Sequence, residues 1–316
     1  MNSKISLYTL VIILVTISAC NRDGADTSNL SNIVSEGASL VKVTEGYEFD
    51  TAGSPLYMNG DLYFTNNNFD SPGELSRTFR MNPDGSIDTL KSGNNVTTTL
   101  KASGDGTIYA CEMLGHRVVE LDQNGQVLNV IADEYDGARI DGPNDLVVDQ
   151  KGGLYFSDSQ FIAGKQTMQP VPSVYYVSAE GELTRVIDDV EFPNGLGLSP
   201  DGGTLYVANT PGTQILAYDV AEDGTVSNGR DFAAVELAED SETSGADGMA
   251  VDSEGNLFVA TTQGLGVQVF NSSGEHLGNI EVPTPSNNVS FGGPDGKTLY
   301  ISAQDGIYKI AVNKEG

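Results

Sequence analysis

Hydrophobic and polar positions follow a pattern that occurs six times along the chain. In each copy a turn segment, most often Asp-Gly, is followed closely by an aliphatic and an aromatic residue. The aromatic positions are separated by 42 to 52 residues and are Tyr63, Tyr109, Tyr155, Tyr206, Phe258 and Tyr300. A repeat of this length, built from short strands and tight turns, is typical of one four-stranded blade of a β-propeller.

A second turn divides the outer half of most copies, as at Pro83-Asp84-Gly85. The last copy is shorter, because only four residues follow GIYKIAV (306–312) and no outer strand remains for blade six. Residues 39–44 (SLVKVT) form a strand-like run without a partner of their own, and we expect them to complete that blade. The pattern therefore predicts an all-β, six-bladed β-propeller over residues 39–316, with four-stranded antiparallel blades and a ring closed by an N-terminal strand. An open stack of sheets is the alternative.

Amide and carboxylate side chains recur at one position of the predicted blades. Each lies 11 or 12 residues before the aromatic position of its copy, and they are Asn144, Asn194, Asp247 and Asn288. The innermost strand begins there and faces the central channel, so we expect these side chains to converge on the axis. Several oxygen donors at one point form a site for a hard cation; Ca²⁺ fits best, with Zn²⁺, Mg²⁺ and Mn²⁺ as alternatives. The competing interpretation is that Asn and Asp only terminate strands.

Histidines are scarce, which narrows the chemistry. His116 and His276 are the two in the chain, and both fall in stretches that we predict to be outer turns. A histidine-based zinc site and a Ser-His-Asp triad are therefore not expected.

The N-terminal region predicts export. Residues 1–19 combine Lys4 with an apolar stretch too short for a stable membrane span, which is typical of a signal peptide. The run Ile17-Ser18-Ala19-Cys20 resembles a bacterial lipobox, so we expect Cys20 to be lipidated; a plain signal peptide is the alternative. Residues 20–38 are polar and predict a flexible tether. We therefore expect a lipid-anchored protein of the bacterial cell envelope, on its periplasmic or outer-membrane face.

Composition limits the partners of the predicted domain. The net charge of −28 repels nucleic-acid backbones and anionic head groups, so we expect no nucleic-acid partner and membrane contact only through the lipid anchor. Cys111 is the only cysteine after Cys20, which leaves no intramolecular disulfide. We expect a monomer whose partner is a small molecule.

Four runs carry a resemblance to a known family: RIDGPNDLVVDQKGGLYFSD (139–158), FPNGLGLSPDGGTLYVANT (192–210), ADGMAVDSEGNLFVA (246–260) and NNVSFGGPDGKTLYIS (287–302). They resemble the SMP-30/gluconolactonase family of six-bladed propellers, and the likeness extends over residues 39–312. It implies a divalent cation in the channel, held by a Glu, two Asn and an Asp, that assists hydrolysis of sugar lactones or related esters. On this resemblance Asn144, Asn194 and Asp247 hold the metal, and Asp247 also acts as general base.

Two further residues receive roles in the same scheme. Asn144, with its neighbour Asp145, would position the substrate or a metal-bound water. Arg139 would steer an anionic or hydroxylated lactone toward the channel mouth. The loop at residues 161–171 would shape that mouth.

The chain departs from the family pattern at two positions. The Glu of the Glu-Gly-Pro motif that opens blade one is missing, because alignment on Pro55 places Gly53 in its slot. Asp50 could replace it if the extra residues bulge. Glu48 and Glu45 are further candidates, although the spacing of Glu45 argues against it. Asp141 stands where bacterial members have Asn, which would add a carboxylate near the mouth.

Two classes of function therefore stay open. The matched polar positions favour a metal-dependent lactonase of the gluconolactonase kind. The missing Glu favours a lipid-anchored propeller that binds a metal or ligand without turnover. Hydrolysis of another ester, such as a phosphotriester, is a variant of the first class.

Overall fold

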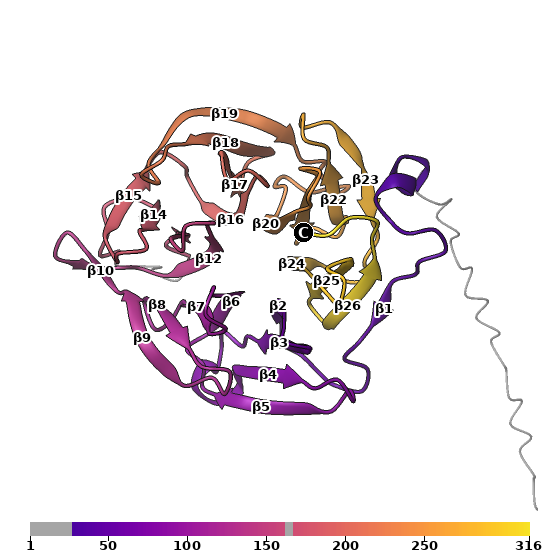
Figure 1. Ribbon diagram of the computed structural model, residues 1–316, viewed down its shortest axis with the longest axis horizontal. Coiled ribbons are helices and arrows are strands. Elements are labelled where there is room, and N and C mark those ends of the chain that lie inside the picture. Colours follow the sequence, from indigo (N-terminus) through magenta and orange to yellow (C-terminus); the bar gives the residue numbers. More distant parts are fainter. Residues whose placement is uncertain (1–26, 162–166) are drawn as a thin grey trace, which may run out of the picture.

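Six β-sheets are arranged around a central axis (Figure 1). The computed structural model describes residues 27–161 and 167–316, and each of the six sheets has four strands. The predicted six-bladed propeller with antiparallel four-stranded blades is thereby confirmed. The segment 1–19, predicted to be a signal peptide, and Cys20 lie outside the described residues. None of the helices in the described ranges is long and apolar enough to cross a membrane.

The blades follow one another along the chain, and within blades one to five the strands are hydrogen-bonded in sequence order. Blades one to three consist of β2 (Ala52–Met58), β3 (Asp61–Asn66), β4 (Arg77–Met81) and β5 (Ile87–Ser92); β6 (Thr97–Ala102), β7 (Ile108–Glu112), β8 (Arg117–Leu121) and β9 (Val127–Ala132); and β12 (Pro143–Val148), β13 (Leu154–Asp158), β14 (Ser173–Val177) and β15 (Leu183–Ile187). Blades four to six consist of β16 (Pro193–Leu198), β17 (Thr204–Asn209), β18 (Gln214–Val220) and β19 (Val226–Ala234); β20 (Ala246–Val251), β21 (Leu257–Thr261), β22 (Gly266–Phe270) and β23 (His276–Ile280); and β24 (Ser286–Gly292), β25 (Thr298–Ala303), β26 (Gly306–Ala311) and β1 (Val41–Lys42).

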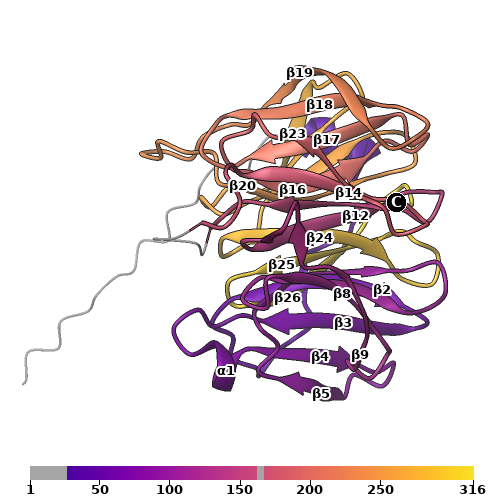
Figure 2. The same ribbon diagram turned by 90° about the vertical axis from the view of Figure 1, so that its left-hand side faces the viewer.

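Three short elements lie outside the blades. They are the 3₁₀ helix η1 (Thr27–Asn32), the helix α1 (Pro72–Leu75) and the hairpin of β10 (Glu134–Tyr135) and β11 (Ala138–Arg139). Figure 2 shows α1 beside the outer strands of blade one. The fold therefore consists almost entirely of blades and the turns that join them.

The turn residues of the sequence pattern form tight hairpins. Asn59 and Gly60 join β2 to β3 with φ angles of 55° and 94°, while Met58 and Asp61 on either side of them are paired. Positive φ at both central residues matches the right-handed twist of the flanking strands, and few residues other than Asn and Gly adopt it readily.

The aromatic residue of each repeat seals one blade against the next. Tyr63 is buried among Leu100, Ile108 and Val119 of blade two, and Phe258 packs in the same way against residues of blade six. Burial of large aromatic rings supplies much of the hydrophobic stabilisation of a core. Their regular spacing along the chain is therefore a consequence of packing between blades.

The N-terminal strand closes the ring as predicted. β1 pairs antiparallel with β26, with Val41 opposite Lys309, and Lys42 Nζ lies 2.8 Å from a carboxylate oxygen of Asp305. The strand is shorter than the predicted run 39–44, although the backbone N–H of Val43 still donates to Ile307.

Residues 27–38, which the sequence analysis assigns to a flexible tether, pack on the propeller instead. Leu30 and Ile33 are buried in the hydrophobic core of blades five and six, and Val34 forms a β-bridge with Val312. Figure 1 shows this indigo segment beside β23. Four apolar side chains in this stretch, Leu30, Ile33, Val34 and Ala38, pack against that core, which explains why the segment is ordered on the propeller.

Candidate functional site

Every inner strand has a register shift near its start, and the predicted site residues lie there. The shift falls between Pro143 and Leu146 in blade three, between Pro193 and Leu196 in blade four, and between Ala246 and Met249 in blade five. Asn144, Asn194 and Asp247 therefore occupy bulged positions. A bulge interrupts the ladder, bends the strand and re-aims a side chain, which explains how residues at strand starts turn toward the axis.

These residues line one cavity of about 450 Å³ at one end of the channel. The structure brings together Asn144, Asn194 and Asp247 from three blades, and Asn288 from a fourth. The remaining lining residues are mostly amides, threonines and apolar side chains: Thr51, Gly53, Asn67, Phe69, Thr98, Met113, Phe161, Phe192, Thr210, Thr262, Pro285, Asn287 and Gln304. Asp247 is thus the only ionisable side chain among the described residues of this wall.

The carboxyl group of Asp247 is surrounded by protein, deep in the channel. Part of its surface faces the cavity, but desolvation and, to a smaller extent, the nearby charge of Asp145 together raise the pKa of Asp247 to about 8. Burial disfavours the charged form of an acid unless an opposite charge compensates. No Lys, Arg or His stands among the described lining residues, so a bound cation is the natural partner of an Asp247 carboxylate.

Asn194 has the orientation of an oxygen donor. Its Nδ2 donates to Thr210 Oγ1 at 2.8 Å, and Thr210 in turn donates to the backbone carbonyl of Ala246, also at 2.8 Å. The Oδ1 atom of Asn194 is buried without a hydrogen-bond partner. A buried carbonyl oxygen of this kind is costly unless something binds it, and a hard cation would do so.

Amides must dominate any metal site here. Within residues 27–161 and 167–316, no three His, Cys, Asp or Glu side chains are grouped to hold a metal. Carboxylate and amide oxygens are nevertheless the donors that Ca²⁺ uses. The residues present therefore fit a hard divalent cation, and they do not fit a zinc site built on histidine or cysteine.

Asp145 ties three blades together directly behind these donors. Its carboxylate accepts the hydroxyl of Thr99 from blade two at 2.8 Å and the backbone N–H of Leu196 from blade four at 2.8 Å. The side chain is buried, and this desolvation raises the pKa of Asp145. Asp145 thus fixes the positions of the strands that carry Asn144 and Asn194.

Proton release on metal binding follows from the raised pKa of Asp247. Because the folded-state value of about 8 exceeds the usual value of roughly 4, the metal-free protein keeps this carboxyl group protonated at pH 6 to 7. A cation would bind the carboxylate form, so we expect metal binding to release nearly one proton and the metal affinity to increase as pH rises toward 8. In the metal-free protein, folding stability changes with pH in the opposite direction to metal affinity. The contribution of Asp247 to stability is present below about pH 4 and is lost as pH rises through 8. Calorimetric Ca²⁺ titrations in buffers of different ionisation enthalpy measure the released proton; pH-independent binding without release would contradict the expectation.

The acidic residues proposed to replace the missing family Glu are not in the cavity. Asp50 is hydrogen-bonded to Asn66. The Nδ2 atom of Asn66 donates to the Asp50 carboxylate at 3.0 Å, and its Oδ1 accepts the backbone N–H of Asp50 at 2.8 Å. Glu45 and Glu48 are exposed. Gly53 does line the cavity, at the position where the alignment placed it, so none of the three acidic side chains supplies a carboxylate there.

Arg139 and Asp141 lie apart from the described cavity lining. Arg139 is exposed on the β10–β11 hairpin. Asp141 is buried rather than exposed in the cavity, and its carboxylate accepts the backbone N–H groups of Met168 at 2.7 Å and Gln169 at 2.9 Å. It anchors part of the loop that the sequence analysis assigned to the mouth, and Phe161 of the same loop lines the cavity.

The histidines are outside this cavity, although one is not at an outer turn. His276 begins the outermost strand of blade five. His116 lies in the β7–β8 turn, close to the cavity-lining Met113, and its Nδ1 contacts the backbone carbonyl of Asp141. The expectation of an outer turn is wrong for His116, because this turn joins the second and third strands at the cavity end of the blade.

Sequence reasoning missed an aromatic rim at the mouth. Phe161 makes edge-to-face contacts with Phe69 and Phe192, with ring centroids 5.9 and 6.0 Å apart. All three rings line the cavity, and Phe69 and Phe161 are largely exposed. They lie in segments between strands, where the repeat pattern offers no signal.

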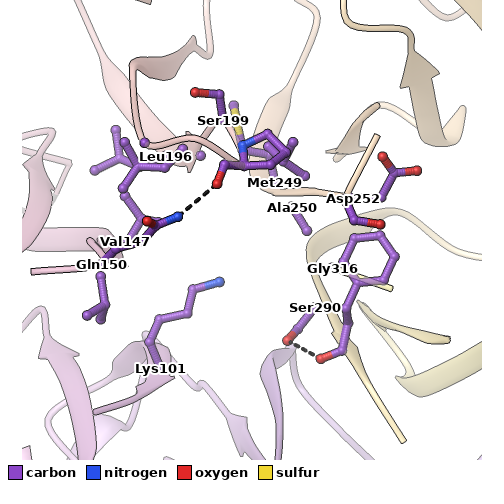
Figure 3. Close-up of a pocket in the computed structure, with 18 of the residues that line it drawn as sticks. Lys101, Val147, Gln150, Leu196, Ser199, Met249, Ala250, Asp252, Ser290 and Gly316 are labelled. Atoms are coloured by element: carbon purple, nitrogen blue, oxygen red, sulfur yellow. Dashed lines mark hydrogen bonds between the residues drawn. The ribbon is translucent and has the colours of Figure 1, made fainter. Parts of the chain in front are cut away.

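The other end of the channel has different chemistry. A second cavity of about 570 Å³ is lined there by the far ends of the same inner strands. Figure 3 shows Lys101 pointing into it, with Gln150 donating to the backbone carbonyl of Pro200 at 2.8 Å. None of the four predicted polar residues lines this cavity, so the candidate site lies at the bulged end alone.

Known proteins share this fold and are similar to this chain in sequence. A family model described as SMP-30/Gluconolactonase/LRE-like region matches residues 51–305. The gluconolactonase of Zymomonas mobilis is 27% identical over 287 residues, which cover 82% of this chain and 80% of that protein. The pentonolactonase XacC of Haloferax volcanii is 28% identical over 242 residues, or 74% of this chain and 76% of that protein. A solved gluconolactonase of Xanthomonas campestris superposes with a TM-score of 0.77 at 27% identity and covers 90% of this chain and 93% of that one. Because the family model matches most of the chain, this protein belongs to the SMP-30/gluconolactonase family.

Proposed function

We propose that this protein hydrolyses a small lactone in the cavity of Asn144, Asn194 and Asp247, with the help of a bound divalent cation for which Ca²⁺ is the best fit. The observation that carries the proposal is the meeting of these three side chains, from three separate blades, in one cavity. The relatives named gluconolactonase and pentonolactonase support the lactone as substrate class.

The residues of the chain would bind the cation, orient the lactone and deprotonate the attacking water. Asn144, Asn194 and Asp247 would hold the cation, and the Asp247 carboxylate would also accept the proton of the attacking water. When bound, the cation supplies positive charge that polarises the lactone carbonyl and stabilises the developing oxyanion. Thr210 keeps the amide of Asn194 in one orientation, and Asp145 keeps blades two, three and four in register. Such prior ordering lets the site stabilise charge without reorganising during the reaction.

Turnover with and without metal tests the proposal. Proton release would be followed for a panel of sugar lactones, aromatic lactones and phosphotriesters, before chelation, after chelation, and after Ca²⁺ is restored. We expect hydrolysis of at least one lactone, loss of activity with chelator, and recovery with Ca²⁺. Turnover that is insensitive to chelator would contradict the role of the cation.

The missing blade-one Glu supports a second candidate, a propeller that binds a metal or ligand without turnover. Gly53 in the Glu slot removes one carboxylate from the set that the family resemblance implies. Catalytic silence across the whole panel, together with retained Ca²⁺ binding, would favour this candidate over the lactonase.

The charge of the cavity predicts a preference for neutral substrates. The net charge is −28, and no cationic side chain stands among the described lining residues, so apart from the bound cation a phosphate group would meet repulsion without a compensating side chain. The threonine and amide side chains can hydrogen-bond sugar hydroxyls instead. We expect kcat/KM for gluconolactone to exceed that for its phosphorylated counterpart by about tenfold or more, which corresponds to roughly 1.4 kcal/mol. Equal values for the two lactones would contradict this expectation.

A further inference from the structure

Asn67 stands on the blade-one side of the cavity, where the family Glu is missing. It follows the last residue of β3, lines the cavity and is 5% exposed. Its Nδ2 donates to the backbone carbonyl of Thr97 at 3.0 Å and to Thr65 Oγ1 at 3.4 Å. Its Oδ1 is buried without a partner. The nitrogen is thus held by the protein, while the oxygen is available to a ligand.

Asn194 has the same arrangement, and Asn287 shows the contrast. In Asn194, too, Nδ2 is bonded to a threonine and Oδ1 has no partner. In Asn287 both ends of the amide are used, because Nδ2 donates to Ala52 at 2.8 Å and Oδ1 accepts the hydroxyl of Ser302. Asn67 therefore resembles Asn194, the proposed metal ligand, rather than Asn287, whose amide is fully hydrogen-bonded within the protein.

Gly53 and Asn67 are complementary in space. A Cβ atom at Gly53 would lie 2.7 Å from Thr65 Oγ1 and 3.1 Å from Asn67 Nδ2. A glutamate side chain at position 53 would therefore collide with the present position of Asn67 and Thr65. A glycine at position 53 thus leaves room for the side chains of Thr65 and Asn67 as they stand.

Asn67 is also linked to Asn144 through β6. It binds the carbonyl of Thr97, and the next residue, Thr98, donates through Oγ1 to the backbone carbonyl of Asn144 at 2.6 Å. One short segment of blade two thus positions both asparagines at the same cavity.

We propose that Asn67 Oδ1 is a ligand of the cation and takes the place of the family Glu. This inference rests on the proposed metal-dependent function. With Asn67, Asn144, Asn194 and Asp247 as ligands, a divalent cation keeps one net positive charge, because Asp247 contributes the only carboxylate. Fewer carboxylates mean weaker binding of Ca²⁺, while the uncompensated charge favours polarisation of a substrate carbonyl.

Ca²⁺ titration of the full chain without substrate tests the inference. Asn67→Ala removes the oxygen, and Asn68→Ala is the matched control, because Asn68 is absent from the lining and its side chain accepts the backbone N–H of Ser71 at 2.6 Å. We expect Asn67→Ala to weaken Ca²⁺ binding by about tenfold or more and Asn68→Ala to leave it within about twofold. Thermal unfolding gives a second readout: the Ca²⁺-induced rise in Tm should shrink for Asn67→Ala only. If Asn67→Ala does not fold, the near-isosteric Asn67→Leu serves in the same titration.

The outcomes separate this inference from the proposed function. Wild-type Ca²⁺ affinity in both Asn67 variants, with or without a change in KM for a lactone, would overturn the ligand role. Absence of Ca²⁺ binding by the wild-type chain would overturn it as well. A selective loss of affinity in Asn67→Ala by a protein that hydrolyses no lactone would support the ligand role and reject the lactonase.

Discussion

We expect Asp247→Asn to lower kcat/KM for a lactone by about 10²- to 10⁴-fold, the range attributed to a positioned general base. The variant keeps the size of the side chain and one carbonyl oxygen, but it removes the only ionisable group in the described wall of the cavity. Ca²⁺ binding should weaken as well, because the three asparagines carry no charge. Proton-release assays at saturating Ca²⁺ and calorimetric titration of the metal measure the two effects.

Asp50→Asn is the matched control for this substitution. It changes charge by the same amount in the same protein, but Asp50 is bonded to Asn66 outside the cavity. We expect wild-type turnover and Ca²⁺ affinity for Asp50→Asn. Substantial activity in Asp247→Asn, or its loss in Asp50→Asn, would contradict the assignment of the site.

We expect Gly195→Ala to damage both stability and metal binding. A Cβ atom at position 195 would lie 1.9 Å from the backbone oxygen of Asp247, so β16 and β20 must separate at the site. The obstacle is backbone and cannot rotate away. Overpacking of this kind costs about 1–3 kcal/mol, and we expect the free energy of unfolding to fall by that amount or more, with weaker Ca²⁺ binding because Asn194 and Asp247 move apart. Denaturant unfolding and Ca²⁺ titration are the measurements.

Gly197→Ala on the same strand provides the comparison. Its Cβ would lie 3.2 Å from Met249 Sδ, and a flexible methionine side chain can shift by a few tenths of an ångström. Neither glycine has a positive φ, so the two substitutions differ mainly in the atom that they meet. Equal losses of stability and of Ca²⁺ affinity for both would show that close approach of β16 and β20 does not shape the site.

The sequence was sufficient to predict the blades and four of the polar residues that line the cavity. The turns and aromatic residues repeat because every blade packs against the next one in the same way, as Tyr63 and Phe258 do. Asn144, Asn194 and Asp247 could be found because equivalent positions of a ring point to one axis. The same logic found Asn288, which lines the cavity.

Blade one shows why the rest could not be predicted. Asp50 has a suitable spacing along the chain, but Asn66 holds it away from the cavity. Asn67 follows a second strand rather than an inner one, so it lies outside the repeating position. Its orientation depends on the carbonyl of Thr97 in the next blade and on the absence of a side chain at Gly53. Such relations exist only after the blades have packed.

The central claim is that one divalent cation binds where blades three, four and five meet. Anomalous diffraction from crystals of the protein grown with Ca²⁺ tests it most directly. We expect a single strong peak in the channel, about 2.3–2.6 Å from oxygen atoms of Asn144, Asn194 and Asp247. A well-ordered cavity without a peak, or Ca²⁺ bound only at a site remote from these three side chains, would contradict it.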